Sequence, residues 1–336
     1  MNIPNKPVTR KDVAERAGVS VTIVSYVLNE NRYVEQAKRE RVLAAVKELN
    51  YRPNTVARAL KGKKNNHILF IADNISNEHF AKIVEEMDQL TYGKGYLISL
   101  LAARNEASFI SQINSRFVDG IVISSTSLEY SYIQQLVASG IPVVLMMNRE
   151  YPAFDRPVGR VYTGLHEGVQ LCVQLLQKKG RKHLVYLDRV SAKGNFSDET
   201  DLRYHGFCHQ MQESGMPITP ESTLTGFSSE AELTAALQAK LLSGAPIDGI
   251  VARNDTLACV ALKAIQHIGL RVPEDISVVG FDNSRLGAYL EPSLTSVALN
   301  RKAIASEIVA MLEQMIAGEE PHTAILHPSL ILRASV

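Results

Sequence analysis

Residues 8–29 read VTRKDVAERAGVSVTIVSYVLN, and this stretch predicts two short helices joined by a tight turn. Thr9 can cap the first helix, because its side-chain oxygen can accept a hydrogen bond from an N–H group of the first turn. Gly18 can take the positive φ that a tight turn requires, and Ser20 can cap a second helix over 21–28. Two short helices joined in this way are typical of a helix-turn-helix.

A third helix is expected over 36–49, because apolar residues recur there at the spacing of one helix face. These residues are Val42, Leu43, Val46 and Leu49. They can close a core with the inward side chains of the first two helices, which are Val13, Ala14, Ala17, Val24, Val27 and Leu28. We therefore expect an all-α head over residues 1–52.

The second helix of a helix-turn-helix enters the major groove of DNA, where its outward N-terminal side chains meet base edges. The outward side chains in this sequence are Val21, Thr22, Ser25 and Tyr26. Thr9 and Thr22 can also contact the DNA backbone, although each is equally well explained as a helix cap. The sequence thus predicts a DNA-reading surface on one helix.

Residues 51–64 read YRPNTVARALKGKK and predict a further, very short helix. Pro53 ends the preceding helix, Asn54 can cap a new one, and Gly62 ends it after barely two turns. A helix of this length is only marginally stable by itself. Its stability must therefore depend on a partner.

Charge is divided unevenly along the chain, although the net charge is only +1. Residues 1–64 hold 14 Lys and Arg against 6 Asp and Glu, whereas residues 65–336 hold 22 against 29. A basic head on an acidic body fits binding to a polyphosphate, with the body repelled from the same surface. On charge alone, a solvated basic surface is the other explanation.

The composition is that of a folded protein and gives no sign of a metal site or a membrane span. Hydrophobic residues make up 46% and charged residues 21%, which is typical of a folded chain of this length with two or three cores. The cysteines Cys172, Cys208 and Cys259 lack the paired short spacing of a thiolate metal site, so we expect no metal and no cofactor. We find no signal peptide and no apolar run near the ~18 residues of a membrane span, so we expect a cytoplasmic protein without a membrane partner.

After residue 64, short apolar runs alternate with amphipathic helices, which predicts βα units and parallel sheets covered on both faces. The expected strands are 67–72, 96–101, 120–124 and 142–147 in a first lobe, and 183–187, 249–252 and 277–281 in a second, with helices at 170–178 and 257–267. The helix after the first strand is expected to bury Phe80, Ile83, Val84, Met87 and Leu90. The expected body is a two-lobed, doubly wound α/β domain whose strand ends face one cleft.

Both parts of the chain resemble the lactose/galactose repressor family. In the head, the resemblance lies in Val8-Thr9, Asp12-Val13-Ala14, Ala17-Gly18-Val19-Ser20, Val24-Ser25, Val27-Leu28-Asn29, and Arg52-Pro53-Asn54 with Ala57-Arg58 and Leu60. In the body, it lies in Arg253-Asn254-Asp255, in the stretch GLRVPEDISVVGFDN at 269–283, and in Pro292-Ser293-Leu294-Thr295. The resemblance covers nearly the full chain.

The resemblance implies a division into three parts and a fold for the body. These parts are a helix-turn-helix domain at 1–52, a hinge helix and linker at 53–64, and an effector-binding and dimerisation domain at 65–336. The last part is expected to resemble periplasmic sugar-binding proteins. Its N-lobe is expected at about 65–161 and 293–320, and its C-lobe at about 162–292 and 321–336.

The resemblance also implies that the hinge helix orders only on the operator. Leu60 is then the residue wedged into the central minor-groove step, and Asn54, Ala57 and Arg58 are further DNA contacts. An apolar wedge suits this task, because it can unstack a base step and kink the duplex. Packing of Leu60 on the body is the alternative.

Two positions depart from the commonest family pattern. Ile23 stands where threonine is usual, and Tyr26 stands where arginine or histidine is frequent. Tyrosine can contact a phosphate or a base edge, but it cannot make the bidentate guanine contact that arginine makes. We therefore expect the operator half-site to differ from that of the arginine-bearing members.

The resemblance places Arg203, Asn254 and Asp282 in an effector pocket, and their donors and acceptors suit a polar ring ligand. Asp255 is equally well explained by a structural role. Further pocket residues implied by the resemblance are His79, Phe80, Thr126, Asn148 and Phe227, with Asn148 standing where aspartate is frequent. Phe227 can stack on a flat ligand, although each aromatic here is equally well explained as core.

The sequence therefore predicts a ligand-responsive transcription repressor that a sugar or sugar derivative releases from its operator. The first alternative is a repressor that needs a nucleobase-like corepressor, as purine-type members of the family do. The second is a cytoplasmic binding protein or an enzyme, but no catalytic or phosphate-binding motif is present, so we expect no enzyme. Because one head makes few specific contacts, we expect a homodimer on a palindromic, double-stranded operator.

Overall fold

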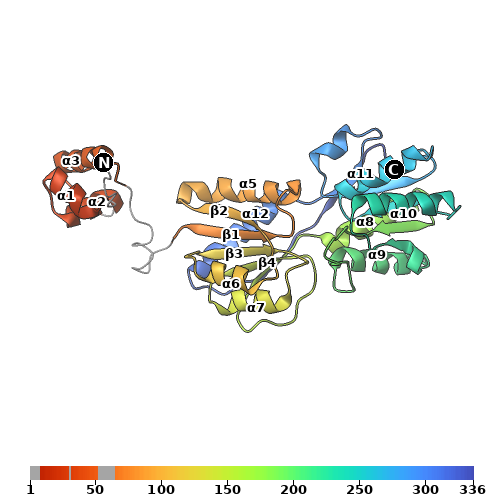
Figure 1. Ribbon diagram of the computed structural model, residues 1–336, viewed down its shortest axis with the longest axis horizontal. Coiled ribbons are helices and arrows are strands. Elements are labelled where there is room, and N and C mark those ends of the chain that lie inside the picture. The colour runs from red at the N-terminus through yellow and green to blue at the C-terminus, as the bar shows by residue number, and fades with distance from the viewer. Residues whose placement is uncertain (1–7, 30–31, 52–64) are drawn as a thin grey trace, which may run out of the picture. The chain divides into compact units, whose positions relative to one another are not determined.

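The computed structural model describes residues 8–29, 32–51 and 65–336 (Figure 1). Contacts between residues divide the chain into two units, Met1–Asn65 and Asn66–Val336. The predicted hinge helix and linker lie outside the described residues, and so do four of the predicted DNA contacts, Asn54, Ala57, Arg58 and Leu60.

The described part of the first unit forms three helices, α1 (Arg10–Ala17), α2 (Val21–Asn29) and α3 (Gln36–Glu48). Thr9 caps α1, because its side chain accepts from the Asp12 N–H while its own backbone N–H donates to Asp12 Oδ2 at 2.7 Å. Gly18 has a φ of +63° and ends the helix in the left-handed conformation. The predicted helix-turn-helix is confirmed.

The core of the head is built from all three helices. Val13, Val24 and Val42 are fully buried, and they form one cluster with Ala14, Ala17, Val27, Ala45 and Tyr51. The expected inward position of Leu43 was wrong, because this side chain is 46% exposed. The inward stripe of α3 runs through Val42 and Ala45, three residues apart, and Leu43 lies about 100° away from it around the helix.

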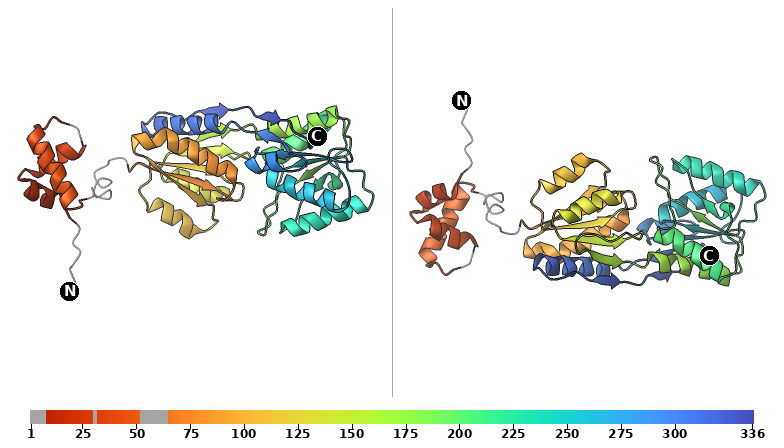
Figure 2. Two further views of the ribbon diagram at one scale, coloured as in Figure 1. Left: turned by 90° about the horizontal axis from the view of Figure 1, so that it is seen from above. Right: turned by 90° about the horizontal axis from the view of Figure 1, so that it is seen from below.

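The first lobe of the second unit has a sheet in which each pair of neighbouring strands is parallel. Its strands, in spatial order, are β11 (Thr323–Ile325), β5 (Gly159–Tyr162), β4 (Val143–Met147), β3 (Gly120–Ser124), β1 (His67–Ala72) and β2 (Leu97–Ala102). Its helices are α5 (Glu78–Thr91), α6 (Ala107–Asn114), α7 (Tyr130–Ala138) and α12 (Arg301–Ile316), with the short η1 (Tyr92–Lys94) after α5. Helices α5 and α12 cover one face, and α6 and α7 the other (Figure 2).

The second lobe repeats this plan. Its strands, in spatial order, are β12 (Ser329–Ile331), β10 (Thr295–Ala298), β9 (Ser277–Phe281), β8 (Gly249–Ala252), β6 (Leu184–Leu187) and β7 (Thr223–Leu224), and β12 alone runs antiparallel to its neighbour. Its helices are α8 (Leu165–Lys178), α9 (Leu202–Glu213), α10 (Glu230–Leu242) and α11 (Asp255–His267), with the short η2 (Pro220–Ser222) and η3 (Arg285–Tyr289). The expected fold class, a helical head with a two-lobed α/β body, is confirmed.

The chain crosses between the lobes three times, and two crossings differ from the expected boundaries. Residues 293–300 were expected in the first lobe, but β10 pairs with β9 and β12 of the second. Residues 321–326 were expected in the second lobe, but β11 pairs with β5 of the first. Strands of three or four residues carry too little periodicity to reveal which sheet they join.

Helix α5 buries a different stripe from the expected one. Its buried residues are His79, Ile83, Met87 and Thr91, whereas Phe80 and Val84 are only half-buried. Leu90, which was expected inward, is 39% exposed. The true stripe contains a histidine and a threonine, which an apolar pattern cannot predict.

The lobes are packed through one continuous apolar cluster. It contains the strands of the first sheet, helices α5 and α12, and the inward residues of α8 and α9, so it passes from one lobe into the other. The remaining face of the second sheet, beneath α10 and α11, has a separate cluster. No helix among the described residues is long and apolar enough to cross a membrane.

Helices α8 and α9 approach each other closely at Gly206. A Cβ added to Gly206 would lie 2.5 Å from the carbonyl oxygen of His166, so Gly206→Ala is expected to push the helices apart. We expect this variant to lower the free energy of unfolding by about 1–3 kcal/mol, measured by urea denaturation. Gly93→Ala is the control, since nothing lies within 4 Å of its added Cβ. Equal stability of the two variants would contradict the close approach.

Candidate functional site

The outward face of α2 contains the predicted DNA-reading residues. Val21 and Thr22 are exposed, and Ser25 and Tyr26 are half-buried, while Val24 between them is fully buried. Val21 and Thr22 therefore lie on the outer side of α2, and Ser25 and Tyr26 lie at the edge of that side. Thr9 is exposed at the start of α1, with its hydroxyl hydrogen-bonded to Asp12 Oδ2 at 2.7 Å.

Two of these side chains already have partners within the head. The Ser25 hydroxyl lies 3.2 Å from Asn29 Nδ2 and 3.4 Å from Arg10 Nη1. The guanidinium of Arg32 lies 5.2 Å from the centre of the Tyr26 ring, within the range of a cation–π contact. These contacts hold α2 against its neighbours and leave the Tyr26 hydroxyl as the polar end of that side chain.

A cleft of about 840 Å³ lies between the two lobes, beyond the carboxyl ends of both sets of parallel strands. Seven of the eight predicted ligand-binding residues line it: His79, Phe80, Thr126, Asn148, Arg203, Asn254 and Asp282. Phe227 does not line it, because this ring packs against the apolar cluster beneath α10 and α11. The structure thus brings together all the predicted pocket residues except one.

Asp282 is the meeting point of charged groups from both lobes. Its carboxylate oxygen lies 3.3 Å from Arg203 Nη2 and 3.9 Å from His79 Nδ1. Its carbonyl oxygen accepts from Arg301 at the start of α12. Burial lowers the pKa of His79 to about 4 although Asp282 acts in the opposite direction, so this imidazole is neutral at neutral pH.

Several buried nitrogen atoms in this part of the cleft lack hydrogen-bond partners. They are His79 Nδ1, Arg203 Nε and Arg301 Nε. The Arg203 guanidinium also stacks 4.6 Å above the Phe281 ring, which fixes its plane. Unsatisfied buried polar atoms cost free energy, so their concentration here is typical of a ligand site.

Asp73 and Thr126 form the opposite wall, at the ends of β1 and β3. The Asp73 carboxylate accepts from the Thr126 backbone N–H at 2.8 Å and from its hydroxyl at 2.9 Å. Ser125 and Ser127 donate to the same carboxylate. Burial alone would raise the pKa of Asp73, but these hydrogen bonds outweigh burial and lower it, so the carboxylate stays charged in the cleft.

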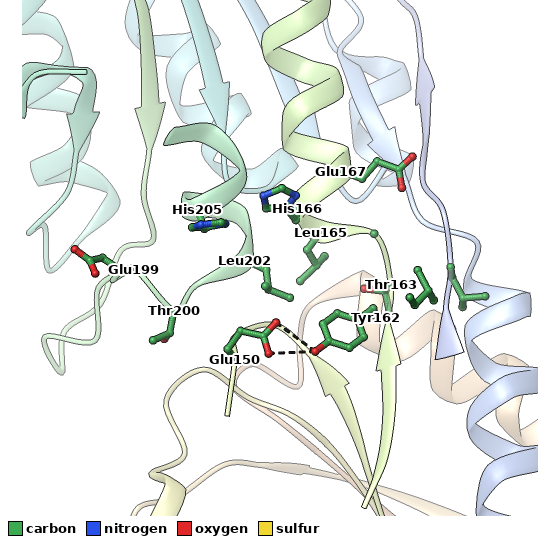
Figure 3. Close-up of a pocket in the computed structure, with 13 residues that line it drawn as sticks. Glu150, Tyr162, Thr163, Leu165, His166, Glu167, Glu199, Thr200, Leu202 and His205 are labelled. Carbon is green, nitrogen blue, oxygen red and sulfur yellow. Dashed lines mark hydrogen bonds between the residues drawn. The ribbon is translucent and has the colours of Figure 1, made fainter. Parts of the chain in front are cut away.

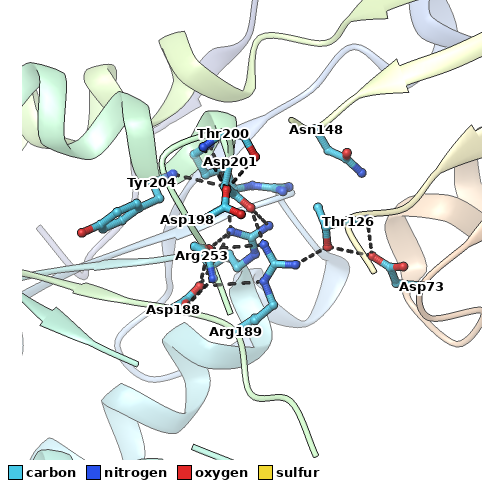
Figure 4. A network of polar contacts seen from close by, with 12 residues as sticks. Asp73, Thr126, Asn148, Asp188, Arg189, Asp198, Thr200, Asp201, Tyr204 and Arg253 are labelled. Carbon is cyan, nitrogen blue, oxygen red and sulfur yellow. Dashed lines mark hydrogen bonds and ion pairs between the residues drawn. The ribbon is translucent and has the colours of Figure 1, made fainter. Parts of the chain in front are cut away.

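Arg189 connects the two lobes across the cleft (Figure 4). Its guanidinium donates to Thr126 Oγ1 of the first lobe and to Asp201 of the second. Asp201 also accepts two hydrogen bonds from Arg253, at 3.0 Å to Oδ1 and 2.8 Å to Oδ2. Burial alone would raise the pKa of Asp201, but Arg253 and Arg189 lower it to about 2.

The predicted residues Asn254 and Asn148 combine cleft and backbone contacts. Asn254 Oδ1 caps α11 by accepting from the Leu257 N–H at 2.9 Å. Asn148 is buried, and its backbone carbonyl oxygen accepts from the Leu202 N–H at 3.1 Å, which ties the end of β4 to the start of α9. Both residues therefore help to hold the cleft walls as well as to line them.

The contacts of Asp255 fit the structural role that the sequence analysis gave as an alternative to ligand binding. Its carboxylate accepts from the Ser284 N–H at 2.5 Å and from Ser296 Oγ at 2.6 Å, linking α11 to the segments beside β9 and β10. Burial raises its pKa to about 6. Asp255 lines the cleft, but these two hydrogen bonds of its carboxylate are made within the second lobe.

The sequence analysis missed the charged network at the lobe junction, namely Asp73, Asp188, Arg189, Asp201, Arg253 and Arg301. A signal was available for three of them, because Asp73, Asp188 and Arg253 directly follow β1, β6 and β8. Polar residues at the carboxyl ends of parallel strands face the cleft. Asp201 follows a long loop and Arg301 begins a helix, and neither position has such a signal.

Among the residues that the structure describes, no three His, Cys, Asp or Glu side chains are arranged to hold a metal ion. The polar groups of the cleft are instead alternating donors and acceptors from Asp, Asn, Thr and Arg side chains. Such an arrangement binds a small polar molecule by hydrogen bonds, with both lobes contributing.

Comparisons with known proteins agree with this geometry. The family model described as "Bacterial regulatory proteins, lacI family" matches residues 9–54, and the "Periplasmic binding protein-like domain" model matches residues 173–336. The HTH-type transcriptional repressor PurR of Pectobacterium carotovorum subsp. carotovorum (strain PC1) is 30% identical, over 98% of this chain and 96% of that protein. PurR of Histophilus somni (strain 129Pt) is 28% identical, over 98% of each chain.

Solved structures with the same fold match 98% of the chain. The lac repressor dimer bound to operator and the anti-inducer ONPF has a TM-score of 0.83 and 26% identity, covering 98% of this chain and 99% of that one. The transcriptional regulator CelR in complex with cellobiose has a TM-score of 0.71 and 24% identity, covering 98% and 100%. The second likeness is evidence for the fold alone.

Replacing Asp201 by asparagine tests the buried network. At neutral pH we expect Asp201→Asn to lower the free energy of unfolding by roughly 3 kcal/mol or more, because Arg253 and Arg189 lose a buried counter-charge. The pKa of Asp201 is depressed in the folded state, so its stabilisation is present above about pH 4 and is lost toward about pH 2. The deficit of the variant, measured by urea denaturation, should therefore shrink over that range. Glu199→Gln, at an exposed neighbour, is the control, and a deficit independent of pH would refute the ionic role.

Proposed function

The chain belongs to the lacI family of bacterial regulatory proteins and is a ligand-responsive DNA-binding repressor, and we propose that a sugar or sugar derivative in its cleft releases it from the operator. The observation that carries the proposal is the cleft itself. Its walls offer Asp282, Asn148 and Asn254 as acceptors, with Arg203 as a donor. Paired acceptors and donors of this kind suit the vicinal hydroxyls of a sugar ring.

A nucleobase-like corepressor is the second candidate. The observation that favours it is the similarity to several repressors named PurR. The lining of the cleft favours a sugar, because Phe80 is the only phenyl or phenol ring among the described lining residues. A flat base would stack on one aromatic face at most, whereas a sugar needs hydrogen bonds more than stacking.

We further propose that the repressor acts in the cytoplasm as a homodimer that reads two half-sites. Large apolar side chains are exposed along one edge of the first lobe, where α5, η1 and the edge strand β2 meet. They are Leu90 at 39%, Tyr92 at 69% and Leu97 at 64% exposure. A contiguous apolar edge of this kind favours association with a second copy, and an unpaired edge strand favours burial.

Release follows from the way the effector contacts both lobes. A ligand that hydrogen-bonds Asn148 on one side and Asp282 on the other binds one lobe angle better than another, so it shifts the population of that angle. In a dimer this would change the separation of the two hinge segments at residues 54–62, and with it the ordering of the hinge helices on the operator.

The experiment that tests the proposal is a titration of the full-length protein with a panel of sugars and nucleobases. A true effector should raise the thermal midpoint, because binding to the folded state stabilises it. The same compound should change operator affinity at fixed salt concentration. Stabilisation by a nucleobase together with tighter operator binding would support the second candidate instead. No operator preference over random DNA would refute both.

Two substitutions separate DNA binding from effector binding. Leu60→Ala should weaken operator binding about tenfold or more without changing effector affinity in DNA-free protein, because it removes the apolar wedge. Asp282→Ala should abolish effector affinity while the DNA-free fold and operator binding persist. Operator binding is measured by fluorescence anisotropy and effector binding by calorimetry. Equal losses of both properties in both variants would contradict this division of roles.

Tyr26→Arg tests the reading surface. Arginine can make the bidentate contact to guanine that tyrosine cannot, so the variant should gain about 1–3 kcal/mol for half-sites with guanine at the contacted position. The check is selection of half-sites from a randomised operator library by wild type and variant. Thr9→Ser, which keeps the helix cap, is the control and should keep the wild-type preference. Identical preferences for the arginine variant and wild type would remove Tyr26 from the reading surface.

A further inference from the structure

A second cavity, of about 430 Å³, lies at the junction of the lobes beside the cleft, and we call it the junction pocket (Figure 3). Its residues come from both lobes and from the crossings between them: Glu150, Tyr162, Thr163, Gly164, Leu165, His166, Glu167, Glu199, Thr200, Leu202, His205, Ile325 and Leu326. Thr163 and Leu165 line the cleft as well, so the β5–α8 crossing is a wall common to both cavities.

The walls of the junction pocket are mainly apolar. Leu165 and Leu202 are almost fully buried at its inner side, and the Tyr162 ring faces them. Ile325 stands at its edge with 68% of its side chain exposed, although β11 packs in the first sheet. An exposed isoleucine beside an apolar cavity gains free energy when a ligand covers it.

The carboxylates of the junction pocket outnumber its basic side chains, which are the two histidines His166 and His205. Glu150, Glu167 and Glu199 line it, and no Lys or Arg is among its described lining residues. The Glu150 carboxylate accepts from the Tyr162 hydroxyl at 3.1–3.2 Å, which places it on the floor of the pocket (Figure 3). Carboxylate oxygens can accept more than one hydrogen bond, so Glu150 keeps capacity for a further donor.

We propose that the junction pocket is a second small-molecule site that binds an aromatic or aliphatic primary ammonium compound. The apolar body of the ligand packs between Leu165, Leu202 and Ile325. Its ammonium group donates to Glu150 and lies near the Tyr162 ring, which also attracts cations. A carboxylate or phosphate ligand is disfavoured, because it would meet the Glu150 carboxylate on the floor while neither lysine nor arginine lines the pocket among the described residues; the nitrogen-bearing side chains there are His166 and His205.

Occupation of the junction pocket is coupled to lobe movement. Glu150 and Tyr162 belong to the first lobe, whereas Leu202 and His205 belong to the second. The width of the pocket therefore depends on the angle between the lobes, and a ligand that fits one width favours one angle. This regulatory consequence rests on the proposed operator function, whereas binding itself does not.

Tryptamine is a suitable probe, because the chain has no tryptophan, so no indole of the protein competes with the fluorescence of the probe. Matched compounds are tryptophol, with a neutral hydroxyl, and indole-3-acetate, with a carboxylate. Full-length protein is titrated with each, and anisotropy of the indole reports binding. We expect tryptamine to bind about tenfold more tightly than tryptophol, and indole-3-acetate to bind least.

Three variants decide where the probe binds. Glu150→Gln should remove the preference for tryptamine over tryptophol, whereas Glu213→Gln, at an exposed glutamate of α9, should keep it. Asp282→Asn should leave tryptamine affinity unchanged, because Asp282 lines only the cleft. Equal binding of the three indoles, or loss of binding in Asp282→Asn but not in Glu150→Gln, would overturn the proposal.

Operator affinity with and without saturating tryptamine tests the coupling. We expect a change of about threefold or more in wild type and none in Glu150→Gln. Binding of tryptamine without any change in operator affinity would overturn the coupling and leave the site intact. Failure of operator binding in the absence of any ligand would refute the proposed function without affecting the anisotropy result.

Discussion

The bidentate ion pair between Asp201 and Arg253 constrains the rest of the body. Both side chains are almost fully buried, and removing either partner would leave the other charge uncompensated. Asp201 also accepts from two backbone N–H groups at the start of α9 and from Arg189, which contacts the first lobe. One carboxylate thus holds the start of α9, Arg253 at the end of β8, and Arg189, which reaches across the cleft. The positions of Arg203 and Leu202 follow from it, because they are the next residues of α9.

Much of this fold could be predicted from the sequence. The strands β1, β3 and β8, which are buried except for His67, were found at their true bounds, because unbroken apolar runs are the strongest signal of a central parallel strand. The first two helices of the head were found from caps and a glycine, and the third from the spacing of its apolar residues. The lobe boundaries near β10 and β11 were wrong, since pairing over three or four residues depends on tertiary contacts that a local pattern does not contain.

The candidate site was predictable where a residue could be matched singly to a family motif, as for Arg203, Asn254 and Asp282. The buried charges around them were not predictable, because Asp188, Asp201 and Arg253 come from separate segments. Their ion pairs form only when the fold brings these segments together. Phe227 shows the opposite error. The position of Phe227 near a strand end suggested stacking on a ligand, but in the folded lobe the Phe227 ring packs against an apolar cluster.

The three crossings between the lobes also determine when each lobe can be completed during synthesis of the chain. Each sheet is completed by a strand from the distal part of the chain, β11 for the first lobe and β12 for the second. A ribosome that has synthesised residues 1–320 has delivered every residue of the helix-turn-helix but neither finished sheet. The DNA-binding head is therefore synthesised well before the ligand-binding cleft is complete. During synthesis, the nascent chain passes through a stage in which its DNA-binding part is present without its sensor.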